Sequence, residues 1–536
     1  MIDVSPAHLQ TILEILKTHA PDCEVRAFGS RVKWTAKNYS DLDLALVGSA
    51  KLPFRKLAAL QTAFEESDLP YRVDVLDWLA ISPEFQKVIE QGYEVIQDPK
   101  GLLRPLGSAS GLAMGSSDWK NYQIGDIGKI VTGKTPPTQN SKNFGDKYPF
   151  ITPKDMLGQK KIRQTERHLS EEGKNAIRNC LLPANSICVS CIGSDMGKVV
   201  MTTEDSVTNQ QLNSIICSDL FDPDFVYYAL INISDELRNV GHHSTAVPIL
   251  NKTDFSNFKI TAPKLPTQRR IAAILSALDE KIELNRQTNA TLEAIAQAIF
   301  KEWFVDFNYP DPKGLSRPLG SRREMIESEL GMIPQGWRVE RLGTVVDVKG
   351  GTTPSTKEEK YWNGEFHWAT PKDLSTLSSP ILLNTERKIT EEGVAQISSG
   401  VLPKGTLLLS SRAPIGYLAI ADIPVSINQG FIAINTLYTS NLFILHWLKV
   451  NMEKVVSRAN GSTFLEISKA NFREIDLVVP DADTVKMFDN VVSPIFEQVK
   501  VNEYQSIILT QVRDSLLPKL MSGEIDVQDP KGLEDL

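Results

Sequence analysis

Two long segments of this 536-residue chain carry apolar residues at the alternating four- and three-residue spacing of helices that pack along their length. The first series runs from Ile271 to Trp303 and the second from Phe488 to Leu520, 217 positions later. At about 1.5 Å per residue, each helix would extend about 50 Å. A single amphipathic helix cannot bury its apolar stripe, so we expect the two to pack antiparallel, with globular domains at opposite ends. The alternative is that each helix lies on its own domain.

Polar residues interrupt both series. Asn285 and Asn502 fall in the middle of the two apolar seams, where a buried polar residue fixes the packing register at some cost in stability. Pro494 lies inside the second segment. Because proline removes a backbone donor and crowds the preceding turn, we expect it to kink or restart that helix.

The segments that precede the two helices repeat each other, which indicates an internal duplication. Four motifs recur in the same order at offsets of 218 to 220 residues: YPFITPKDM (148–156) with FHWATPKDL (366–374), TERHLSEEG (165–173) with TERKITEEG (385–393), LLPANSICVSC (181–191) with VLPKGTLLLSS (401–411), and TNQ (208–210) with INQ (427–429). The chain is therefore predicted to run as domain, long helix, domain, long helix, behind an N-terminal domain of its own.

The expected boundaries follow from these patterns and from stretches rich in proline and glycine. They are an N-terminal domain (1–97), a linker (98–117), a first repeated domain (118–264), the first long helix (265–307), a linker (308–335), a second repeated domain (336–480), the second long helix (481–523) and a tail (524–536). The sequence DPKGL occurs at 98–102, 311–315 and 529–533, each time after such a unit, as linkers at a fusion seam would.

The stretch GKIVTGKTPP (128–137) fits the phosphate-binding loop of nucleotide hydrolases. The duplication argues against that interpretation, because Gly351-Thr352-Thr353 stands opposite Gly133-Lys134-Thr135 and the lysine is absent. A phosphate loop also needs a helix that starts at this point, and Pro136-Pro137 disfavours one. We interpret the shared Gly-x-Thr-Pro as a turn after a strand.

Composition indicates an ordinary globular protein, with 41% hydrophobic and 23% charged residues. No apolar run approaches the ~20 residues of a membrane span, and the N-terminus lacks a signal-peptide pattern, so we expect a cytoplasmic protein with no membrane partner. Of the five cysteines, Cys188 and Cys191 have CxxC spacing without a second ligand pair, and we interpret them as buried strand residues. The net charge of −8 comes from the two ends of the chain and leaves the repeated domains without an acidic excess.

The duplicated motifs resemble the specificity (S) subunit of type I restriction-modification enzymes. The resemblance covers about residues 118–525 and also rests on the entry LPTQRRIAAILSALDEKIELNRQ (265–287) and on the closing segments FKEWFVDF (300–307) and LLPKLMSGEI (516–525). It implies two α/β target recognition domains that each recognise half of an asymmetric, bipartite double-stranded DNA target, separated by two long antiparallel coiled-coil helices. It also implies two docked methyltransferase subunits, restriction subunits that join through the assembled complex, and no catalysis or cofactor in this part.

Base recognition needs side chains that form paired hydrogen bonds, Arg or Lys for guanine and Asn or Gln for adenine. The candidate DNA-binding residues are Lys134, Lys154, Ser194, Gln210, His242 and His243 in the first domain and Thr353, Lys372, Arg412, Gln429 and Ser462 in the second. Features that both copies share, such as Pro-Lys-Asp and Asn-Gln, favour a scaffold role over base contact, since two domains that recognise different bases should differ where they touch them. His242-His243 is equally consistent with a solvated loop.

A separate pattern lies in FGSRVKWTAKNYSDLDLALVG (28–48). Gly29 and Ser30 form a turn after a predicted strand, where backbone amides and a hydroxyl can hold a phosphate. Asp41 and Asp43 alternate on the next strand, so that both carboxylates project from one face, as a magnesium site requires. Asp74, in RVDVLD (72–77), is a third carboxylate that can serve as base or ligand.

This stretch resembles the minimal nucleotidyltransferases of the polymerase-beta superfamily, over residues 1–97. The resemblance implies a small mixed α/β domain in which Asp41, Asp43 and Asp74 are catalytic, Asp41 and Asp43 bind Mg²⁺, and Gly29 and Ser30 hold a nucleoside triphosphate. Trp34 departs from the pattern, because that family usually has glycine there.

The sequence thus predicts an α/β multidomain protein in which a DNA-specificity subunit is fused to a nucleotidyltransferase-like domain. The alternative is a nucleotidyltransferase of the antitoxin type whose C-terminal region binds protein partners. A self-contained nuclease or methylase lacks support, since the chain carries neither an Asn-Pro-Pro-Tyr-like motif nor a clustered Asp/Glu-Lys motif.

Overall fold

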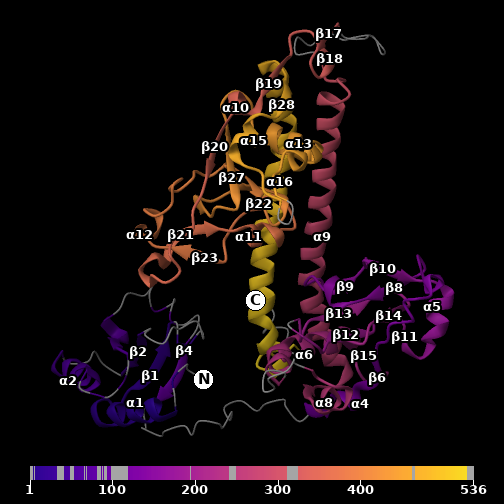
Figure 1. Ribbon diagram of the computed structural model, residues 1–536. Coiled ribbons are helices and arrows are strands. Elements are labelled where there is room, and N and C mark those ends of the chain that lie inside the picture. Colours follow the sequence, from indigo (N-terminus) through magenta and orange to yellow (C-terminus); the bar gives the residue numbers. More distant parts are fainter. Residues whose placement is uncertain are drawn as a thin grey trace. The chain divides into compact units, whose positions relative to one another are not determined.

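The computed structural model describes residues 4, 6–29, 31–32, 41–48, 54–65, 67, 69, 71–80, 86, 89, 93–97, 119–193, 195–240, 249–310, 324–461 and 465–527. The chain forms two compact units, an N-terminal unit (1–115) and a C-terminal unit (116–536). Figure 1 traces both, from indigo at the N-terminus to yellow at the C-terminus. Among the described residues, none of the helices combines the length and apolar character that crossing a membrane would require.

The described residues of the N-terminal unit form a four-stranded mixed sheet in the order β3-β2-β1-β4. Its elements are α1 (Pro6–His19), β1 (Glu24–Phe28), β2 (Leu42–Val47), α2 (Phe54–Glu65), β3 (Val73–Asp77), the 3-10 turn η1 (Trp78–Ala80) and β4 (Tyr93–Gln97). Alternate residues of β2, Leu42, Leu44 and Leu46, form one core with buried residues of α1 and α2. Since successive strand residues face opposite sides, Asp43 projects from the face away from this core.

The first repeated domain contains two five-stranded sheets, in the orders β6-β15-β12-β13-β9 and β11-β14-β8-β10-β7. The strands are β6 (Gly128–Thr132), β7 (Phe144–Gly145), β8 (Tyr148–Ile151), β9 (Lys161–Ile162), β10 (Arg167–Leu169), β11 (Leu181–Leu182), β12 (Ile187–Ser190), β13 (Val199–Thr202), β14 (Ser206–Thr208) and β15 (Leu212–Cys217). The helices are α4 (Ile124–Ile127), η3 (Ser141–Asn143), η4 (Pro153–Asp155), α5 (Glu171–Ala176), η5 (Arg178–Cys180), α6 (Pro223–Asn232), α7 (Ser234–Val240) and α8 (Lys252–Asn257). A two-stranded ladder of β5 (Lys120–Gln123) with β16 (Lys259–Ala262) closes the domain.

The second repeated domain has the same central strand order, β20-β27-β24-β25-β22, beside a smaller sheet β23-β21-β26. The strands are β20 (Val346–Gly350), β21 (Trp362–Ala369), β22 (Ile381–Leu382), β23 (Arg387–Ile389), β24 (Leu407–Ser411), β25 (Ile415–Ala421), β26 (Val425–Ile427) and β27 (Phe431–Thr436). The helices are α10 (Leu342–Val345), η7 (Glu359–Tyr361), α11 (Pro371–Ser375), α12 (Glu391–Val394), α13 (Asn441–Val450), α14 (Met452–Ser457) and α15 (Lys469–Arg473). A closing ladder of β19 (Arg338–Arg341) with β28 (Asp476–Val479) recurs, and a hairpin of β17 (Met325–Ser328) and β18 (Gly331–Pro334) precedes it.

Two long helices, α9 (Leu265–Phe304) and α16 (Ala482–Ser522), lie side by side in the C-terminal unit (Figure 1). They are antiparallel, because Phe300 near the end of α9 packs on Phe488 near the start of α16, with ring centroids 5.8 Å apart. No position of either predicted seam is exposed. The expectation that the helices pack on each other is confirmed, and the alternative that each lies alone on its own domain is wrong.

The two asparagines of the seams meet at the middle of the helix pair. Asn285 Nδ2 lies 3.3 Å from the backbone oxygen of Asn502, and Asn502 Nδ2 donates to Asn289 Oδ1 at 2.8 Å. Asn285 and Asn502 are equivalent by the duplication, and equivalent residues touch only where a two-fold axis passes. The helix pair therefore has an approximate two-fold axis near Asn285 and Asn502.

Proline does not interrupt the second helix. Pro494 and Pro518 both lie inside the continuous helix α16, so the expected restart at Pro494 is wrong. Pro494 is exposed, which places its ring on a solvent-facing side of the helix. Phe488 and Val492 before it and Val499 after it are all buried, and this packing keeps the segments on both sides of the proline helical.

The first domain attaches to the helix pair through a buried charged cluster. Tyr228 of α6 donates to Asp279 Oδ2 of α9 at 2.6 Å, and Arg513 Nη1 of α16 reaches Asp279 Oδ1 at 2.7 Å. Lys160 adds hydrogen bonds to Ser276 Oγ at 2.6 Å and to Tyr228 at 3.3 Å. We call Lys160, Tyr228, Asp279 and Arg513 the charged anchor. Its burial raises the pKa of Tyr228, whose hydroxyl faces the Asp279 carboxylate.

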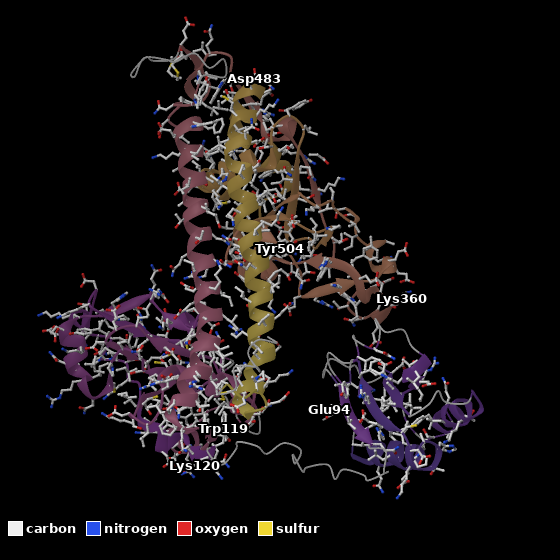
Figure 2. All side chains as sticks on the ribbon, turned by 180° about the vertical axis from the view of Figure 1, so that it is seen from behind. Glu94, Trp119, Lys120, Lys360, Asp483 and Tyr504 are labelled. Carbon is white, nitrogen blue, oxygen red and sulfur yellow. The ribbon has the colours of Figure 1, made fainter. Side chains whose placement is uncertain are left out.

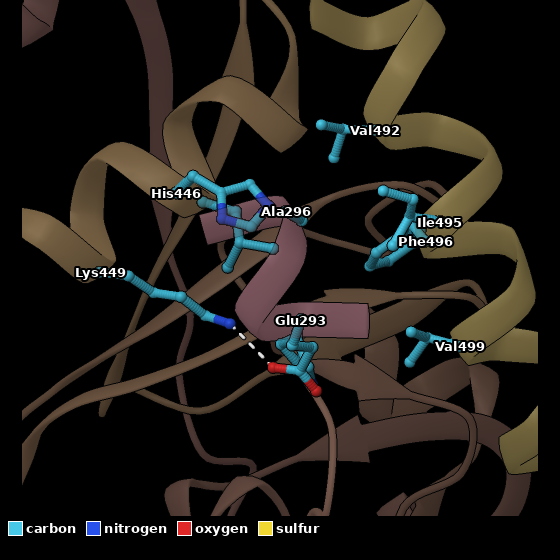
Figure 3. A pocket seen from close by; sticks show the side chains of 10 residues that line it. Glu293, Ala296, His446, Lys449, Val492, Ile495, Phe496 and Val499 are labelled. Carbon is cyan, nitrogen blue, oxygen red and sulfur yellow. Dashed lines mark hydrogen bonds and ion pairs between the residues drawn. The ribbon is translucent and has the colours of Figure 1, made fainter. Parts of the chain in front are cut away.

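The second domain attaches at the opposite end through residues that line a small, mostly apolar pocket (Figure 3). Four of them, Pro380, His446, Phe496 and Ala296, stand at the positions that the duplication makes equivalent to Lys160, Tyr228, Asp279 and Arg513. We call these four residues the apolar anchor. His446 Nδ1 pairs with Gln297 Oε1 at 2.9 Å, and beside it Lys449 Nζ binds Glu293 Oε2 of α9 at 2.9 Å. Burial, assisted by the Lys449 charge, lowers the pKa of His446 to about 3. Farther along α16, Tyr504 donates to Asp422 at 2.8 Å and ties the helix to the domain (Figure 2).

Candidate DNA interfaces and a candidate nucleotide site

Of the candidate residues that the structure describes, Lys134, Gln210, Thr353, Arg412 and Gln429 lie where the strands of the central sheet end on one side. Neighbouring strands there are antiparallel, so the end of β6, the start of β15, the end of β12 and the start of β13 share that side. The same holds for β20, β27, β24 and β25. We call these positions the loop edge: residues 133–135, 191–193, 195–197, 209–211 and 249–250 in the first domain and 351–353, 411–416, 428–430 and 466–467 in the second.

A threonine–glutamine hydrogen bond recurs at both loop edges. Thr135 Oγ1 lies 2.7 Å from Gln210 Oε1, and Thr353 Oγ1 lies 2.5 Å from Gln429 Oε1. Both glutamines are exposed. The bond occupies the oxygen of each amide and leaves its two N–H donors for other acceptors. Gln210, Thr353 and Gln429, which the sequence singled out separately, are thus parts of one duplicated arrangement.

A glycine allows the chain to press against this turn in both domains. A Cβ at Gly133 would lie 2.1 Å from the backbone oxygen of Asn209, and one at Gly351 would lie 1.8 Å from that of Ile427. Any larger residue would force the Gly-x-Thr-Pro segment away from the Asn-Gln turn. No helix starts at Lys134, since the segment after β6 is irregular up to η3. The structure therefore also argues against a phosphate-binding loop here. Lys134 is an exposed residue of the loop edge.

The Pro-Lys-Asp motif forms a capped turn at the side of each loop edge. Asp155 accepts from the amide and hydroxyl of Thr152, each at 2.7 Å, and Asp373 does the same with Thr370. These aspartates fix the turn, as scaffold residues do. The lysines between proline and aspartate point outward: Lys154 is exposed, and Lys372 binds Glu386 at 2.8 Å. That ion pair raises the pKa of Lys372.

Arg412 follows β24 on the loop edge of the second domain and is partly exposed. Its Nη1 lies 3.6 Å from Glu466 Oε2, and the two residues also form an isolated backbone bridge. In the first domain the equivalent bridge joins Ile192 and Ile249. Sequence reasoning missed Ile192, Ile249 and Glu466. The signal that points to Ile192 is its alignment with Arg412, 220 residues on, as an unlike residue between matching strands.

Several predicted site residues lie outside the described residues. They are Ser30 in the N-terminal unit and Ser194, His242, His243 and Ser462 in the two repeated domains; Trp34 is also outside. Their predicted roles stay predictions. Cys188 and Cys191 are buried at β12, as expected, and burial raises their pKa values to about 12 and about 11.

The carboxylates of the N-terminal unit meet on the face of the sheet away from the helices. Asp43 of β2 and Asp74 of β3 are register partners on adjacent parallel strands, and Asp41 precedes β2 by one residue. Gly29 follows β1 with φ of +82°, and a Cβ there would lie 2.3 Å from Asp43 Oδ2. The glycine turn thus lies directly beside the carboxylate. Burial, together with the negative charges of Asp74 and Asp41, raises the pKa of Asp43.

This arrangement gathers negative charge beside a glycine turn. The negative charges of Asp74 and Asp41 add to the effect of burial on the pKa of Asp43. A cation would neutralise this negative charge. Arg72 Nε binds Asp74 Oδ1 at 2.8 Å from the solvent side and compensates only one of the carboxylates. Among the described residues, no group of three or more His, Cys, Asp and Glu side chains could hold a metal ion. Ser30, the neighbour that would complete the turn, is outside them.

Comparison with known proteins assigns both units to families. The family described as type I restriction modification DNA specificity domain matches residues 116–294 and 334–503, and the family described as polymerase beta, nucleotidyltransferase matches residues 10–100. The specificity subunit of the type I restriction enzyme MjaIX from Methanocaldococcus jannaschii is 28% identical over 428 residues, which cover 77% of this chain and 94% of that protein.

The N-terminal region has a relative of its own. The probable protein adenylyltransferase MntA from Haemophilus influenzae is 47% identical over 97 residues, which cover 18% of this chain and 85% of that protein. Among solved structures, the S subunit of a type I restriction-modification system from M. genitalium is 17% identical and covers 76% of this chain and 98% of that one, with a TM-score of 0.45. The chain belongs to the type I restriction-modification DNA specificity family and carries a polymerase-beta-type nucleotidyltransferase domain at its N-terminus.

Proposed function

We propose that residues 118–525 recognise an asymmetric, bipartite double-stranded DNA target, one half through each loop edge. The observation that supports this most is that the two loop edges have similar strands and hydrogen bonds but carry different exposed or partly exposed side chains. Examples are Lys134 against Thr352 and Ile192 against Arg412. A common scaffold with unlike contact residues suits two domains that recognise different base sequences.

The helix pair supplies the separation that such a target requires. Each helix of about 40 residues is roughly 60 Å long at ~1.5 Å per residue. Two readers on one face of a duplex need to be separated by about one or more turns of ~34 Å. Because the helices meet about an approximate two-fold axis, the two loop edges are related as the two halves of a DNA site are. Because the side chains of the two loop edges differ, the DNA target is asymmetric.

We further propose that the helix pair docks two methyltransferase subunits, with restriction subunits joining through the assembled complex. Exposed apolar residues repeat at equivalent positions on the two helices: Leu284 and Val501 are 54% and 55% exposed, and Ile295 and Val512 are 45% and 39% exposed. Water-exposed apolar side chains on an otherwise satisfied helix are typical of protein interfaces. Two copies of one surface suit two copies of one partner.

The test is a selection of random double-stranded DNA by the full chain with its methyltransferase subunits. We expect two different short specified blocks separated by a gap of fixed length. Selection of a single continuous block, or of no sequence at all, would contradict the proposal. A truncated chain that begins at residue 116 should select the same DNA, which separates this function from the N-terminal unit.

For the N-terminal unit we propose transfer of a nucleoside monophosphate from a nucleoside triphosphate to a protein hydroxyl. The support is the carboxylate cluster beside Gly29 and the likeness to a protein adenylyltransferase. Asp41 and Asp43 would hold Mg²⁺, which when bound neutralises the triphosphate. Gly29 gives the triphosphate room beside Asp43, and Ser30 would donate to a phosphate oxygen.

In this proposal Asp74 accepts the proton of the attacking hydroxyl. The hydroxyl oxygen bonds to the α-phosphorus, the bond from that phosphorus to the bridging oxygen breaks, and pyrophosphate leaves. The test is transfer of labelled nucleotide to protein by the full chain. Asp43→Asn should abolish it, whereas Arg72→Ala, which removes only the solvent-side partner of Asp74, should retain it. Equal transfer by the Asp43→Asn variant and the wild type would refute the assignment.

A further inference from the structure

A backbone bridge occupies the same place at both loop edges. Directly after the central strand, Ile192 pairs with Ile249 in the first domain, and Arg412 pairs with Glu466 in the second. The flanking hydrogen bonds also match: Leu250 N donates to Cys191 O at 2.8 Å, and Ile467 N donates to Ser411 O at 3.0 Å. The duplication has therefore kept the backbone here.

The side chains on this shared backbone differ completely. One bridge carries two isoleucines, and Ile249 is 59% exposed. The other carries an ion pair whose side chains are 36% and 49% exposed, with Arg412 Nη1 3.6 Å from Glu466 Oε2. An exposed isoleucine adds little to folding, because most of its surface remains in water. A folding role would therefore explain neither the exposed isoleucine nor its replacement by charges.

The backbone on which Glu466 stands is fixed. Its amide donates to Asn460 O and its oxygen accepts from Asn460 N, both at 2.9 Å, in addition to the bridge to Arg412. A carboxylate on a fixed backbone can hold one side of a guanidinium and leave the other side free. At 3.6 Å the contact between Arg412 and Glu466 is loose enough for Arg412 to keep its paired donors for an outside acceptor.

Arg412 and Gln429 lie on adjacent segments of the backbone. Ser411 N donates to Gly430 O at 2.8 Å, which joins the bridge to the Asn-Gln turn. In the first domain Cys191 N donates to Gln211 O at 2.8 Å in the same way, beside Gln210. In both domains the bridge thus lies within the loop edge and beside a residue with free hydrogen-bond donors.

We propose that this bridge is a specificity-determining position in both domains, which rests on the proposed DNA recognition. Arg412 recognises a guanine through its paired N–H donors, and Glu466 is a positioning residue that orients the guanidinium. Ile192 and Ile249 present an apolar surface at the equivalent place, which favours the methyl group of a thymine. These are the base partners that the major groove offers to a guanidinium and to an apolar side chain.

The test is DNA selection by the full chain with its methyltransferase subunits, using variants at each bridge. Arg412→Ile combined with Glu466→Ile should lower the guanine preference about 10-fold at one base pair of one half-site and leave the other half-site unchanged. Glu466→Gln, which keeps the size of the side chain, should weaken the same preference without lowering affinity for non-specific DNA. Ile249→Ala should weaken a thymine preference in the opposite half-site.

The matched control is Arg338→Ile with Glu340→Ile, an exposed Arg–Glu pair on β19, before the opposite end of β20. It should leave every base preference unchanged. If Arg412→Ile weakens binding to all sequences equally and lowers the salt dependence by about one charge, Arg412 contacts phosphate and the inference is wrong. Unchanged preferences would also overturn it. A wild-type chain that selects no sequence would instead overturn the proposed function, before any variant is compared.

Discussion

The two ends of the helix pair hold their domains by different chemistry. At one end the charged anchor joins α6, α9 and α16 through Tyr228, Asp279 and Arg513, with Lys160 beside them. At the other end every equivalent position is uncharged: Pro380 for Lys160, His446 for Tyr228, Phe496 for Asp279 and Ala296 for Arg513. The duplication has kept the strand order and the helix register and has changed the attachments.

The difference teaches that fold and attachment are separable in this molecule. One domain joins the helices through a cluster centred on a buried carboxylate, and the other joins them through apolar packing with the Lys449–Glu293 ion pair beside it. Neither domain can be moved to the other end of the helix pair without the helix residues that contact it. A buried carboxylate needs nearby cations, whereas an apolar surface gains nothing from cations. The attachments therefore determine which domain occupies which end, while the loop edges are free to diverge.

The largest expected effect is the removal of the carboxylate from the charged anchor. Asp279→Phe, which copies the residue of the other end, should lower the free energy of unfolding by about 3 kcal/mol, because it leaves the partly buried Arg513 with only the exposed Asp514 as its anion. Denaturant unfolding of the full chain measures this. The control Arg338→Ala removes an exposed ion pair and should cost less than about 0.5 kcal/mol. A cost as small as that of the control would show that the anchor contributes nothing.

The next effect should be the same in both domains, since it concerns the shared scaffold. Gly133→Ala and Gly351→Ala each place a Cβ within 2.1 Å or less of a backbone oxygen. Each should cost about 2 kcal/mol of unfolding free energy, because the Gly-x-Thr-Pro turn must shift. Gly125→Ala is the control, since its Cβ would lie 3.5 Å from Ser256 in ordinary contact. A large cost in only one domain would break the equivalence of the two scaffolds.

The apolar anchor should respond to pH, whereas the charged anchor has no histidine. The pKa of buried His446 is about 3, below the ~6.5 of an unfolded histidine, so the unfolded chain binds more protons between these values. The stability that His446 contributes is present above about pH 6.5 and is lost as the pH falls. The loss should be about 1 kcal/mol between pH 7 and pH 5.5.

The charged groups beside His446 are Lys449, which faces it, and Glu293, which pairs with Lys449. The measurement is the free energy of unfolding at several pH values for the wild type and for His446→Gln, which keeps a hydrogen-bonding side chain. The variant should lose about 1 kcal/mol less than the wild type between pH 7 and pH 5.5. The same slope in both proteins would show that the effect arises elsewhere.

The smallest effect concerns the repeated apolar surface of the helices. Leu284→Glu and Val501→Glu should each weaken the binding of one methyltransferase subunit by about 1 kcal/mol and leave stability within ~0.5 kcal/mol. Calorimetric titration of the full chain with methyltransferase subunit measures both binding steps. The double variant should weaken both steps, whereas Glu substitution at the already polar Gln287 should weaken neither. An effect of only one of the two single variants would contradict the equivalence of the surfaces.

The sequence alone was enough for those parts of the structure that depend on local pattern. The seam spacing predicted both long helices and their packing, and the mid-seam asparagines predicted a fixed register, because each signal repeats within a few residues. The alternation of Asp41 and Asp43 predicted a shared face, and the structure adds Asp74 beside Asp43 as its strand partner. The duplicated motifs predicted the shared scaffold.

The anchors and the bridges escaped prediction for a physical reason. Lys160, Tyr228, Asp279 and Arg513 come from four distant segments, and no pattern within any one of them indicates that they meet. Pro494 misled because its effect on a helix depends on packing on both sides, which a local rule does not include. Ile249 resembles any surface residue until the backbone bridge places it opposite Ile192.

The central claim is that two domains on a two-fold helix pair recognise the two halves of one DNA site. Its most direct measurement is the DNA target of a chimera in which the first domain also replaces the second, with Phe496→Asp and Ala296→Arg to supply the charged anchor at that end. Selection of random DNA by this chimera and its methyltransferase subunits should give an inverted repeat of one wild-type half-site with the wild-type spacing. A direct repeat, or an unchanged asymmetric target from a folded chimera, would contradict the claim.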